Sequence, residues 1–497
     1  MRLIIRTDAS VAIGSGHVMR CLALAQAWHD RGGECIFAMA VSTTAVLQRL
    51  RAEGFETYTV TGTAGGPGDA RQIIGLSRER NAGWIAVDGY HFDVEYHKRL
   101  RDAGLKLLLI ADQANAAHCV ADIVVNQNSH ACDGMYAKHE PYTQLLLGPR
   151  YALLRREFRS WEKWKRDVAP IGRKVLVTMG GSDPKNITSL VIRALGLLKI
   201  EFEARVVAGG GNPHIAQLES LVSQTSHIEL HIDSSNISDL MAWADVAVSG
   251  AGSTCWEICL LGLPAILIDI AENQKPIAED LDKKSVAIHP GSGQEIVTEQ
   301  LAARLEQLLL TTDLRAAMSQ RGCELVDGRG ASRVVSAMRN DSLHLRRVVR
   351  EDCRVLWEWA NDQESRKYSF QSQQITWDQH VRWLDSKIDD PNYILFMVTN
   401  TDDVPVGHVR YELNKCRAVV SINMAPLFRS NGLGKEVLRM ATQELFVSSR
   451  ATEVNAYVKP VNERSLRLFA GEGFERQADS TVAGQHAAHF VLKKAFQ

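Results

Sequence analysis

The stretch "IGSGHVMRC", Ile13–Cys21, decides the fold class of the first part of this chain. It follows the apolar run "RLIIRT" within a few residues, so a buried strand leads through a glycine-containing loop into a helix. Gly14 and Gly16 let the loop backbone adopt positive φ angles and approach a ligand closely. The helix that begins near His17 offers free amide donors and a positive dipole end. The stretch therefore predicts an α/β domain with a phosphate-tolerant loop and an imidazole at its edge, although a lone histidine can also simply pack or cap a helix.

The composition excludes several classes of protein. A chain of 497 residues is too long for one ordinary core, so we expect two or three domains. The net charge of -1 provides no electrostatic footprint for nucleic acid or anionic lipid. Charges interrupt the first apolar run, which predicts neither a signal peptide nor a membrane span, and we expect a cytoplasmic protein. The nine cysteines show no CxxC spacing, so we expect free thiols and no metal site.

Two series of apolar runs predict two parallel sheets. The first series is "RLIIRT", "ECIFAM", "WIAVD", "KLLLIA" and "IVVN", alternating with helical patterns up to about Tyr151. After the charged linker "REFRSWEKWKRDVAPIGRK", the second series is "KVLVTM", "ARVVAGG", "IELHI", "DVAVS" and "PAILIDI". A helix from about Ala302 to Arg339 would close this part. We predict two facing Rossmann-like domains, residues 1–160 and 161–340, with a cleft between them. Polar residues follow several strands of the first sheet, where ligands gather: Asp8, Asp88, Asp112 and Asn126.

The style of the sequence changes at about Leu343. "LHLRRVV" alternates like an antiparallel strand, and "REDCRVLWEWANDQESRKY" has the pattern of an amphipathic helix. "YILFMVTN", "VGHVRYEL" and "AVVSINMAP" read as hairpin-linked strands. We predict a third domain of α+β type over residues 341–497.

Two glycine-containing stretches of the second sheet suit a nucleotide. "MGGSDPKN", Met179–Asn186, ends a strand with two glycines and a Ser/Asp pair, and we expect free amides at the helix start that follows. "SGAGSTCWE", Ser249–Glu257, adds two hydroxyls that suit a diphosphate. Glu257 can accept two hydrogen bonds from a ribose diol, or it can be an ordinary solvated helix residue. The candidate binding residues of this half are Gly180, Gly181, Gly252, Ser253, Thr254, Glu257, Asn273 and Gln274.

These residues resemble a known family over Met1 to about Arg339. "RTDASVAIGSGHVMRCLALA", "VDGYHFD", "LGPRYALLRREF", "TMGGSDPKN" and "SGAGSTCWE" are similar to the UDP-sugar hydrolases of pseudaminic acid biosynthesis, which release UDP from UDP-2,4-diacetamido-2,4,6-trideoxy-β-L-altropyranose. The resemblance implies the two-domain GT-B fold of nucleotide-sugar transferases. It also implies that His17 is the base that activates a water, and that no metal is needed because helix N-termini and Arg155 carry the diphosphate charge. Asp8, Arg20 and Tyr90 would line the cleft, and structural hydrogen bonding at strand ends is an equal alternative for them.

The third domain has a second glycine loop. "FRSNGLGKEV" contains the pattern R-x-x-G-x-G between a strand and a long helix, and "VNERSLRLFAGEGFE" follows later. Together these stretches resemble the GCN5-related N-acetyltransferases (GNAT), and "WEWANDQESRKYS" with "HVRW" is similar to the branch that acetylates amino-sugar nucleotides. The resemblance implies acetyl-CoA as cofactor, bound by Arg429, Ser430, Asn431, Gly432, Leu433, Gly434, Lys435 and Asn462.

One position departs from that family. Many members have a tyrosine four residues before the Gly-Phe pair, as the acid for the departing thiolate, and this chain has Phe469 there. Tyr457, a water, or no protein acid at all are the alternatives.

The sequence thus predicts a bifunctional enzyme that acetylates the 4-amino group of a UDP-linked amino sugar and then hydrolyses the UDP bond. The first alternative is a GT-B glycosyltransferase fused to an acetyltransferase of other substrate, which the stretch "YALLRREF" disfavours. The second is a non-catalytic sugar-nucleotide sensor, which His17 in its glycine loop disfavours.

Overall fold

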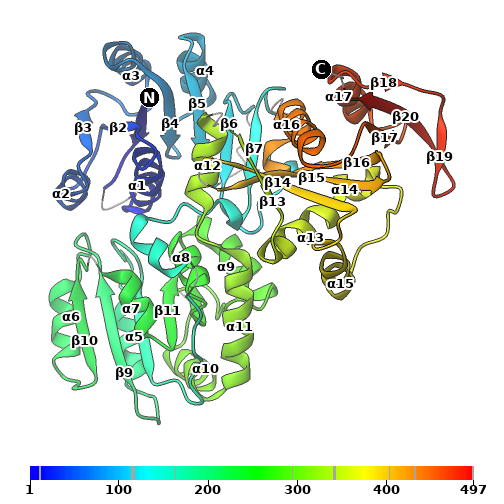
Figure 1. Cartoon of the computed structure of the whole chain (residues 1–497). Helices are drawn as coiled ribbons and strands as arrows, with labels where there is room; N and C mark the ends of the chain where they lie inside the picture. Colours follow the sequence, from blue (N-terminus) through cyan, green and yellow to red (C-terminus); the bar gives the residue numbers. More distant parts are fainter. Residues whose placement is uncertain are drawn as a thin grey trace. The chain divides into compact units, whose positions relative to one another are not determined.

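The computed structural model describes residues 1–494 except 11–12, 113–117, 163, 235, 294, 340–342, 402 and 430–432. The chain forms two compact units, Met1–Val335 and Ser336–Gln497 (Figure 1). Within the described residues, no helix is long and apolar enough to cross a membrane.

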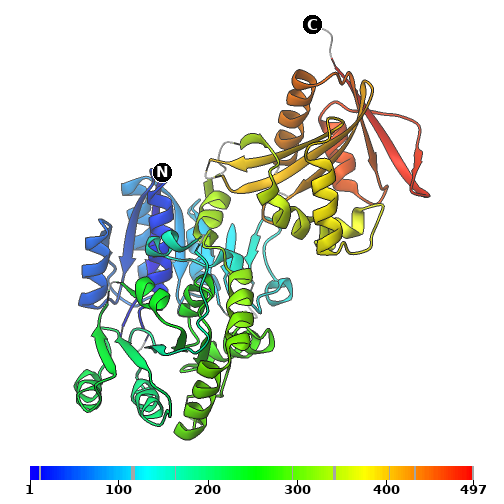
Figure 2. The ribbon, with the colours of Figure 1, turned by 60° about the horizontal axis from the view of Figure 1, so that its bottom comes forward.

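The N-terminal half of unit 1 contains a seven-stranded parallel sheet in the order β3-β2-β1-β4-β5-β6-β7. Its strands are β1 (Arg2–Thr7), β2 (Glu34–Met39), β3 (Glu56–Thr59), β4 (Ala82–Asp88), β5 (Lys106–Ile110), β6 (Ile123–Asn126) and β7 (Gln144–Leu147). Its helices are α1 (Gly16–His29), α2 (Thr44–Ala52), α3 (Pro67–Arg80) and α4 (Val94–Asp102). Both α1 and α3 pack on β1, and Leu3, Ile4 and Ile5 are fully buried, because helices cover both faces of the sheet (Figure 2).

The C-terminal half of unit 1 contains a five-stranded parallel sheet in the order β10-β9-β8-β11-β12. Its strands are β8 (Lys174–Thr178), β9 (Glu203–Ala208), β10 (Ile228–Ile232), β11 (Val246–Gly250) and β12 (Ala265–Ile268). Its helices are α5 (Ile187–Leu195), α6 (Ile215–Val222), α7 (Ile237–Trp243), α8 (Thr254–Leu260), α9 (Lys275–Lys283), α10 (Thr298–Leu310) and α11 (Thr312–Leu325). The next helix, α12 (Gly330–Arg339), contacts the N-terminal half, where Arg333 donates to the carbonyl of Arg150, and it contains the boundary between the two units. One large apolar cluster joins this sheet to Ala152, Leu154 and Phe158 of the linker.

The strand orders place the site before any side chain is considered. In each sheet, successive strands are first added on one side of the first strand and later on its other side. The strand order therefore reverses between β1 and β4 in the first sheet and between β8 and β11 in the second. Ligands of parallel sheets bind at the carboxyl ends of strands at such switch points. His17 follows β1 and Asp88 ends β4, while Gly180 follows β8 and Gly252 follows β11.

Two expectations about unit 1 are wrong. The single helix expected from Ala302 to Arg339 is three helices, because the chain turns at Thr311 and again before α12, where Gly328 has a φ of 82°. The free amides expected after Gly180 and Gly181 are not free, because the buried carboxylate of Asp183 accepts hydrogen bonds from the first amides of α5, at 2.9 Å and 2.8 Å.

Unit 2 contains a mixed sheet in the order β13-β14-β15-β16-β17-β20-β18, with β19 paired to β20. Its strands are β13 (Leu343–Arg347), β14 (Tyr393–Asn400), β15 (Pro405–Asn414), β16 (Arg417–Met424), β17 (Glu453–Val458), β18 (Glu475–Arg476), β19 (Ser480–Val482) and β20 (Gln485–Lys493). Its helices are α13 (Cys353–Asn361), α14 (Gln363–Tyr368), α15 (Trp377–Lys387), α16 (Leu433–Ser448) and α17 (Glu463–Gly471). The helix expected over "REDCRVLWEWANDQESRKY" is therefore divided into α13 and α14, because Asp362 caps α14 by accepting from the amide of Ser365.

The sheet of unit 2 has one helix layer on each face. His408 of β15 stacks on Trp359 of α13, whereas the hydroxyl of Tyr411, three residues later, lies 2.8 Å from Thr442 of α16. Since neighbouring side chains of a strand alternate between faces, α13 and α16 lie on opposite sides. The parallel strands β16 and β17 pair only from Arg417–Val419 to Glu453–Asn455 and then separate. This separation leaves strand edges where an extended chain can add hydrogen bonds.

Candidate functional site

His17 lies at the N-terminus of α1 and is held by a buried carboxylate. Its Nδ1 is 2.6 Å from Oδ1 of Asp88, the last residue of β4. Arg20, one helical turn after His17, donates to both oxygens of Asp88 at 2.6 Å. Burial alone would raise the pKa of Asp88, but Arg20 and His17 outweigh it and hold that pKa well below its ordinary value. Asp88 is therefore ionised and accepts, so Nδ1 of His17 carries its proton and Nε2 is left as the basic nitrogen.

A second carboxylate extends this network to Tyr90. Arg20 also donates to Asp112 at 2.6 Å, and the hydroxyl of Tyr90 donates to Asp112 at 3.2 Å. The ring of Tyr90 meets the ring of His17 edge to face, with centroids 5.0 Å apart. Burial and the neighbouring charge of Asp112 raise the pKa of Tyr90 to about 12, so its hydroxyl keeps its proton at neutral pH.

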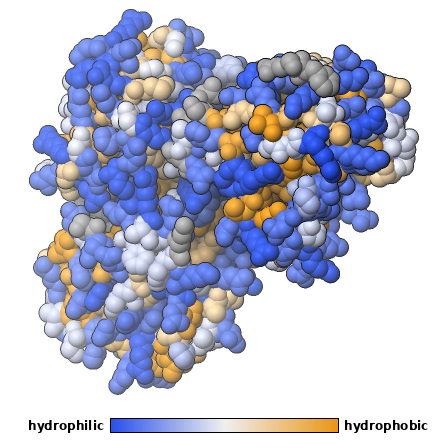
Figure 3. Space-filling view, viewed as in Figure 1, coloured by the Kyte–Doolittle hydropathy of each residue, from blue (hydrophilic) through white to orange (hydrophobic). Residues whose placement is uncertain are grey.

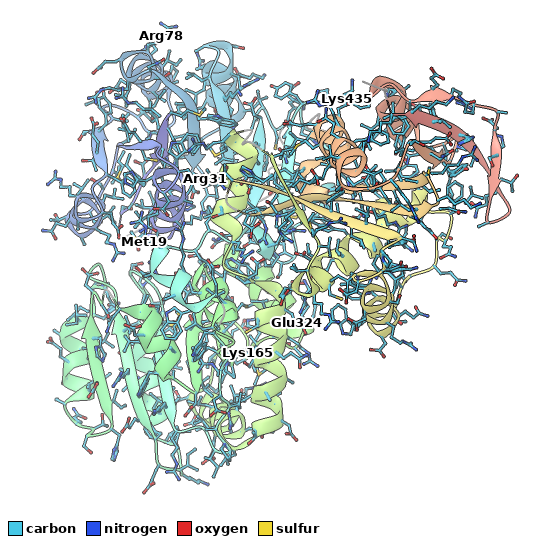
Figure 4. The ribbon with its side chains drawn as sticks, in the orientation of Figure 1. Met19, Arg31, Arg78, Lys165, Glu324 and Lys435 are labelled. Carbon is cyan, nitrogen blue, oxygen red and sulfur yellow. The ribbon has the colours of Figure 1, made fainter. Side chains whose placement is uncertain are left out.

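The two halves of unit 1 meet beside His17. Asn273, in the short helix η4 (Glu272–Gln274) after β12, donates to the hydroxyl of Tyr90 at 2.9 Å. A Cβ atom on Gly181 would lie 2.5 Å from Oγ of Ser15, so the loop after β8 approaches the His17 loop closely. Met19, labelled in Figure 4, lies on this first turn of α1. The predicted residues Gly14, Gly16, His17, Arg20, Tyr90, Gly181 and Asn273 thus gather at one junction between the halves.

The residues expected to hold a nucleotide form a second group at the same junction. Arg155, just after the N-terminal half, donates to Glu257 of α8 at 2.8 Å, and both side chains are mostly buried. Burial raises the pKa of Glu257 above its ordinary value, and Arg155 only partly opposes this. Gln274 accepts from the amide of Ile270 at 3.1 Å, and its amide nitrogen lies beside Gly252. Ser253 and Thr254 form the start of α8, where Ser253 makes no capping hydrogen bond with its side chain.

Asp8 has a different environment from the one expected of a cleft residue. Its side chain is buried, accepts from the amides of Ala40 and Val41, and pairs with Arg6 and His91 at 2.8 Å and 3.0 Å. Burial alone would raise its pKa, but these partners lower it to about 2. The geometry favours the structural alternative for Asp8, which fixes the loop that carries Tyr90.

Of the residues expected to hold acetyl-CoA, Arg429 follows β16, Leu433, Gly434 and Lys435 begin α16, and Asn462 precedes α17. The guanidinium of Arg429 is bound inside the unit, to Asp362 at 2.6 Å, Ser365 at 3.0 Å and the carbonyl of Met424 at 3.1 Å. Asn462 caps α17 by accepting from Ser465, and Gly434 faces that helix through Leu468. Leu433 and Lys435 lie in the first turn of α16, where Lys435 is labelled in Figure 4. Ser430, Asn431 and Gly432 lie outside the described residues.

Two side chains that sequence reasoning had not assigned to a site, Asp88 and Asp112, complete the group around His17. They were noticed only as strand ends. The sequence signal that could have found them is that His17 and Arg20, one helical turn apart, face the ends of two adjacent strands. In unit 2, Phe469 is buried against Phe474, whereas Tyr457 stacks on His489 with centroids 4.7 Å apart. No group of three or more His, Cys, Asp or Glu among the residues with described positions is arranged to hold a metal ion. The visible face of unit 1 is mainly hydrophilic (Figure 3).

Comparison with known proteins agrees with this architecture. Residues 175–327 match the glycosyltransferase family 28 C-terminal domain, and residues 342–475 match the acetyltransferase (GNAT) domain. An uncharacterized protein of Methanocaldococcus jannaschii is 24% identical over 96% of this chain and 97% of its own length. UDP-2,4-diacetamido-2,4,6-trideoxy-beta-L-altropyranose hydrolase of Campylobacter jejuni is 27% identical over 58% of this chain and 98% of its own length. The crystal structure of Acinetobacter baumannii MurG is 14% identical, covers 68% of this chain and all of its own, and has a TM-score of 0.49.

The fold class expected from the sequence is confirmed. Unit 1 consists of two Rossmann-like halves of the GT-B type, and unit 2 is an α+β domain that matches the acetyltransferase (GNAT) domain model.

Proposed function

We propose that unit 1 hydrolyses a UDP-linked 2,4-diacetamido-2,4,6-trideoxy sugar to UDP and free sugar, and that unit 2 acetylates the 4-amino group of the preceding UDP-amino sugar with acetyl-CoA. The observation that carries the first half is the pair of His17 and Asp88, which leaves Nε2 of His17 basic at the junction of the two sheets. The hydrolase relative from Campylobacter jejuni, which aligns over 98% of its own length with 58% of this chain, supports the choice of substrate.

In this proposal His17 Nε2 takes a proton from the water that attacks the anomeric carbon of the sugar. The bond between that carbon and the diphosphate oxygen breaks, and UDP leaves with the electron pair. Asp88 stabilises the imidazolium that forms, and the ring of Tyr90 packs edge to face against the imidazole. Glu257 would accept from the ribose diol, and Arg155, already paired with Glu257, would orient that carboxylate and neutralise part of the diphosphate charge.

For unit 2, the separation of β16 and β17 fits an acyl carrier with an extended amide-containing arm. Beyond Val419 and Asn455, the backbone groups of β16 and β17 no longer pair with each other, and they can bind the amides of such an arm. Acetyl-CoA would supply the activated acetyl group there. The start of α16, with Leu433, Gly434 and Lys435, would lie near its pyrophosphate.

The test of the hydrolase is UDP release from the UDP-linked diacetamido sugar with water alone and EDTA present. We expect the full chain to release UDP, and the His17→Asn variant to lose about 100-fold to 10,000-fold in rate. The matched control is His29→Asn, on the exposed last turn of the same helix, which should keep the full rate. A requirement for a second sugar or lipid acceptor would instead favour a glycosyltransferase. The match of residues 175–327 to the glycosyltransferase family 28 C-terminal domain is compatible with that activity too.

A further inference from the structure

The position four residues before the Gly-Phe pair supplies no acid for the departing thiolate. Phe469 of α17 has no titratable group and is buried against Phe474 and Phe490. An amine acceptor is largely protonated at neutral pH, and its nitrogen attacks a thioester only after it loses a proton. A base is therefore needed beside the acceptor amine.

Three residues of the adjacent strands β17 and β20 form a chain of oriented hydrogen bonds. The amide nitrogen of Asn455 donates to the carboxylate of Glu453 at 2.9 Å. Because a carboxylate only accepts, this contact fixes the orientation of the amide and turns its oxygen toward His489. The distance from that oxygen to Nε2 of His489 is 2.7 Å. Nε2 therefore donates, and Nδ1 is left as the ring nitrogen that can accept a proton.

The ring plane of His489 is held as well as its tautomer. His489 and Tyr457 are directly opposed in the antiparallel ladder, and their rings stack with an interplanar angle of 13°. Asn455 is mostly buried, while His489 is partly exposed, so the chain leads from a fixed interior group to an accessible one. Its titratable neighbours on β17 are Tyr457 and, through Asn455, Glu453.

This group lies beside the gap between β16 and β17. Asn455 is the last residue of β17 that pairs with β16, and Tyr457 is two residues further on the same face. That face is opposite to the face of Ala456 and its ladder partner Phe490, which contacts Phe469 of α17. Across the gap, Asn423 of β16 contacts Ser365 of α14, and beyond Tyr457 the side chain of Lys459 lies over the ring of Phe370. The face that carries His489 is thus the one that α14 and its following loop cover.

We infer that His489 is the general base of acetyl transfer in unit 2, held in its reactive tautomer by Asn455 and Glu453. His489 Nδ1 takes one proton from the acceptor ammonium and later releases it to water. The freed amine nitrogen bonds to the thioester carbon, the C–S bond breaks, and the sulfur leaves with the electron pair. The second proton of the amine goes to the departing sulfur, so that an amide and a free thiol result. The inference rests on the proposed acetyltransferase activity, and it does not depend on which amine is the substrate.

The test compares His489→Gln with His486→Gln in the full chain. Glutamine at 489 can still donate to Asn455 but cannot take a proton, and His486 lies on the same strand, is mostly exposed and pairs with Asp479. Thiol release from acetyl-CoA is followed with a UDP-linked 2-acetamido-4-amino-2,4,6-trideoxy sugar at pH 6.5 and pH 9.5. At pH 6.5 we expect His489→Gln to lose about 100-fold in kcat/KM for the amine with an unchanged KM for acetyl-CoA, and His486→Gln to match the wild type. At pH 9.5 the amine is already deprotonated, and the deficit should shrink to within about tenfold.

A second variant keeps the imidazole and removes its orientation. Asn455→Leu should give a smaller deficit than His489→Gln, again larger at pH 6.5 than at pH 9.5. Equal deficits of His489→Gln at both pH values, or a rate equal to the wild type, would overturn the assignment. If the wild-type chain does not acetylate the UDP-linked sugar but acetylates a free amino sugar, the proposed substrate is wrong, and the same variants are compared with that amine. If it acetylates neither, both proposals fail.

Discussion

Replacing Asp88 by asparagine tests how much the orientation of His17 contributes to the rate of UDP release. Asp88 accepts three hydrogen bonds at 2.6 Å, one from His17 and two from Arg20, and its side chain has no exposed surface. An asparagine of the same size has one accepting oxygen, and its NH₂ group must face a donor of Arg20 or the ring nitrogen of His17. If that NH₂ faces His17, Nδ1 must accept, and the proton moves to Nε2, where the base is needed.

The expected losses follow from these contacts. UDP release should fall by about 100-fold to 10,000-fold, the range typical for loss of a general base. The free energy of unfolding should fall by about 3–5 kcal/mol, because Arg20 loses Asp88, the buried one of its two carboxylate partners. The comparison is Asp112→Asn, which also takes a carboxylate from Arg20 but leaves His17 and Asp88 in contact. We expect it to destabilise the chain less, since Asp112 is partly exposed, and to stay within about tenfold of the wild-type rate. Measured by UDP release and thermal unfolding, equal rate losses in the two variants would refute the orienting role of Asp88.

Three further predictions concern binding, acid stability and independence of the units. Glu257→Gln should weaken UDP binding in calorimetry by about 1–3 kcal/mol, because a charge-assisted hydrogen bond to the ribose is lost, and an unchanged Kd would argue against a ribose role. The folded-state pKa of Asp8 is lowered to about 2, so the stability it contributes is present above its unfolded pKa near 3.8 and is lost as the pH falls toward 2. The Asp8→Asn variant should therefore be less stable than the wild type at pH 7 and should lose less stability between pH 5 and pH 2. An equal loss of stability in the two proteins over this range would contradict the prediction. A fragment that begins at Ser336 should fold by circular dichroism and bind acetyl-CoA, because unit 2 has its own sheet and core, and a disordered fragment would show that it depends on unit 1.

The strands that were predicted are those whose burial can be read from apolar runs. The strands β1, β2, β4, β5 and β6 each carry such a run and lie inside the sheet or next to its edge. The strands β3 ("ETYT") and β7 ("QLLL") were missed because they are the two edge strands, which are short and only partly buried. The break before α14 depends on one hydrogen bond of Asp362, which competes with a strong helical pattern on both sides.

The sequence indicated single residues of the candidate site but not the network that joins them. The glycine loop and the helix start pointed to His17, whereas Asp88 and Asp112 were recognised only as strand ends. That Arg20 joins these two carboxylates depends on the adjacency of β4 and β5 beside α1, which is a property of the folded sheet. The same holds for the Glu453, Asn455 and His489 chain, because it joins two strands that lie far apart in the sequence.

The most direct test of the proposed hydrolase is the fate of the oxygen of water. UDP release is run in oxygen-18 water with the UDP-linked diacetamido sugar, and both products are examined by mass spectrometry before the free sugar exchanges its anomeric oxygen with the solvent. Attack of the water activated by His17 at the anomeric carbon predicts the label on the sugar and unlabelled UDP. Label on the phosphate of UDP would mean attack at phosphorus, and would contradict the role given to His17.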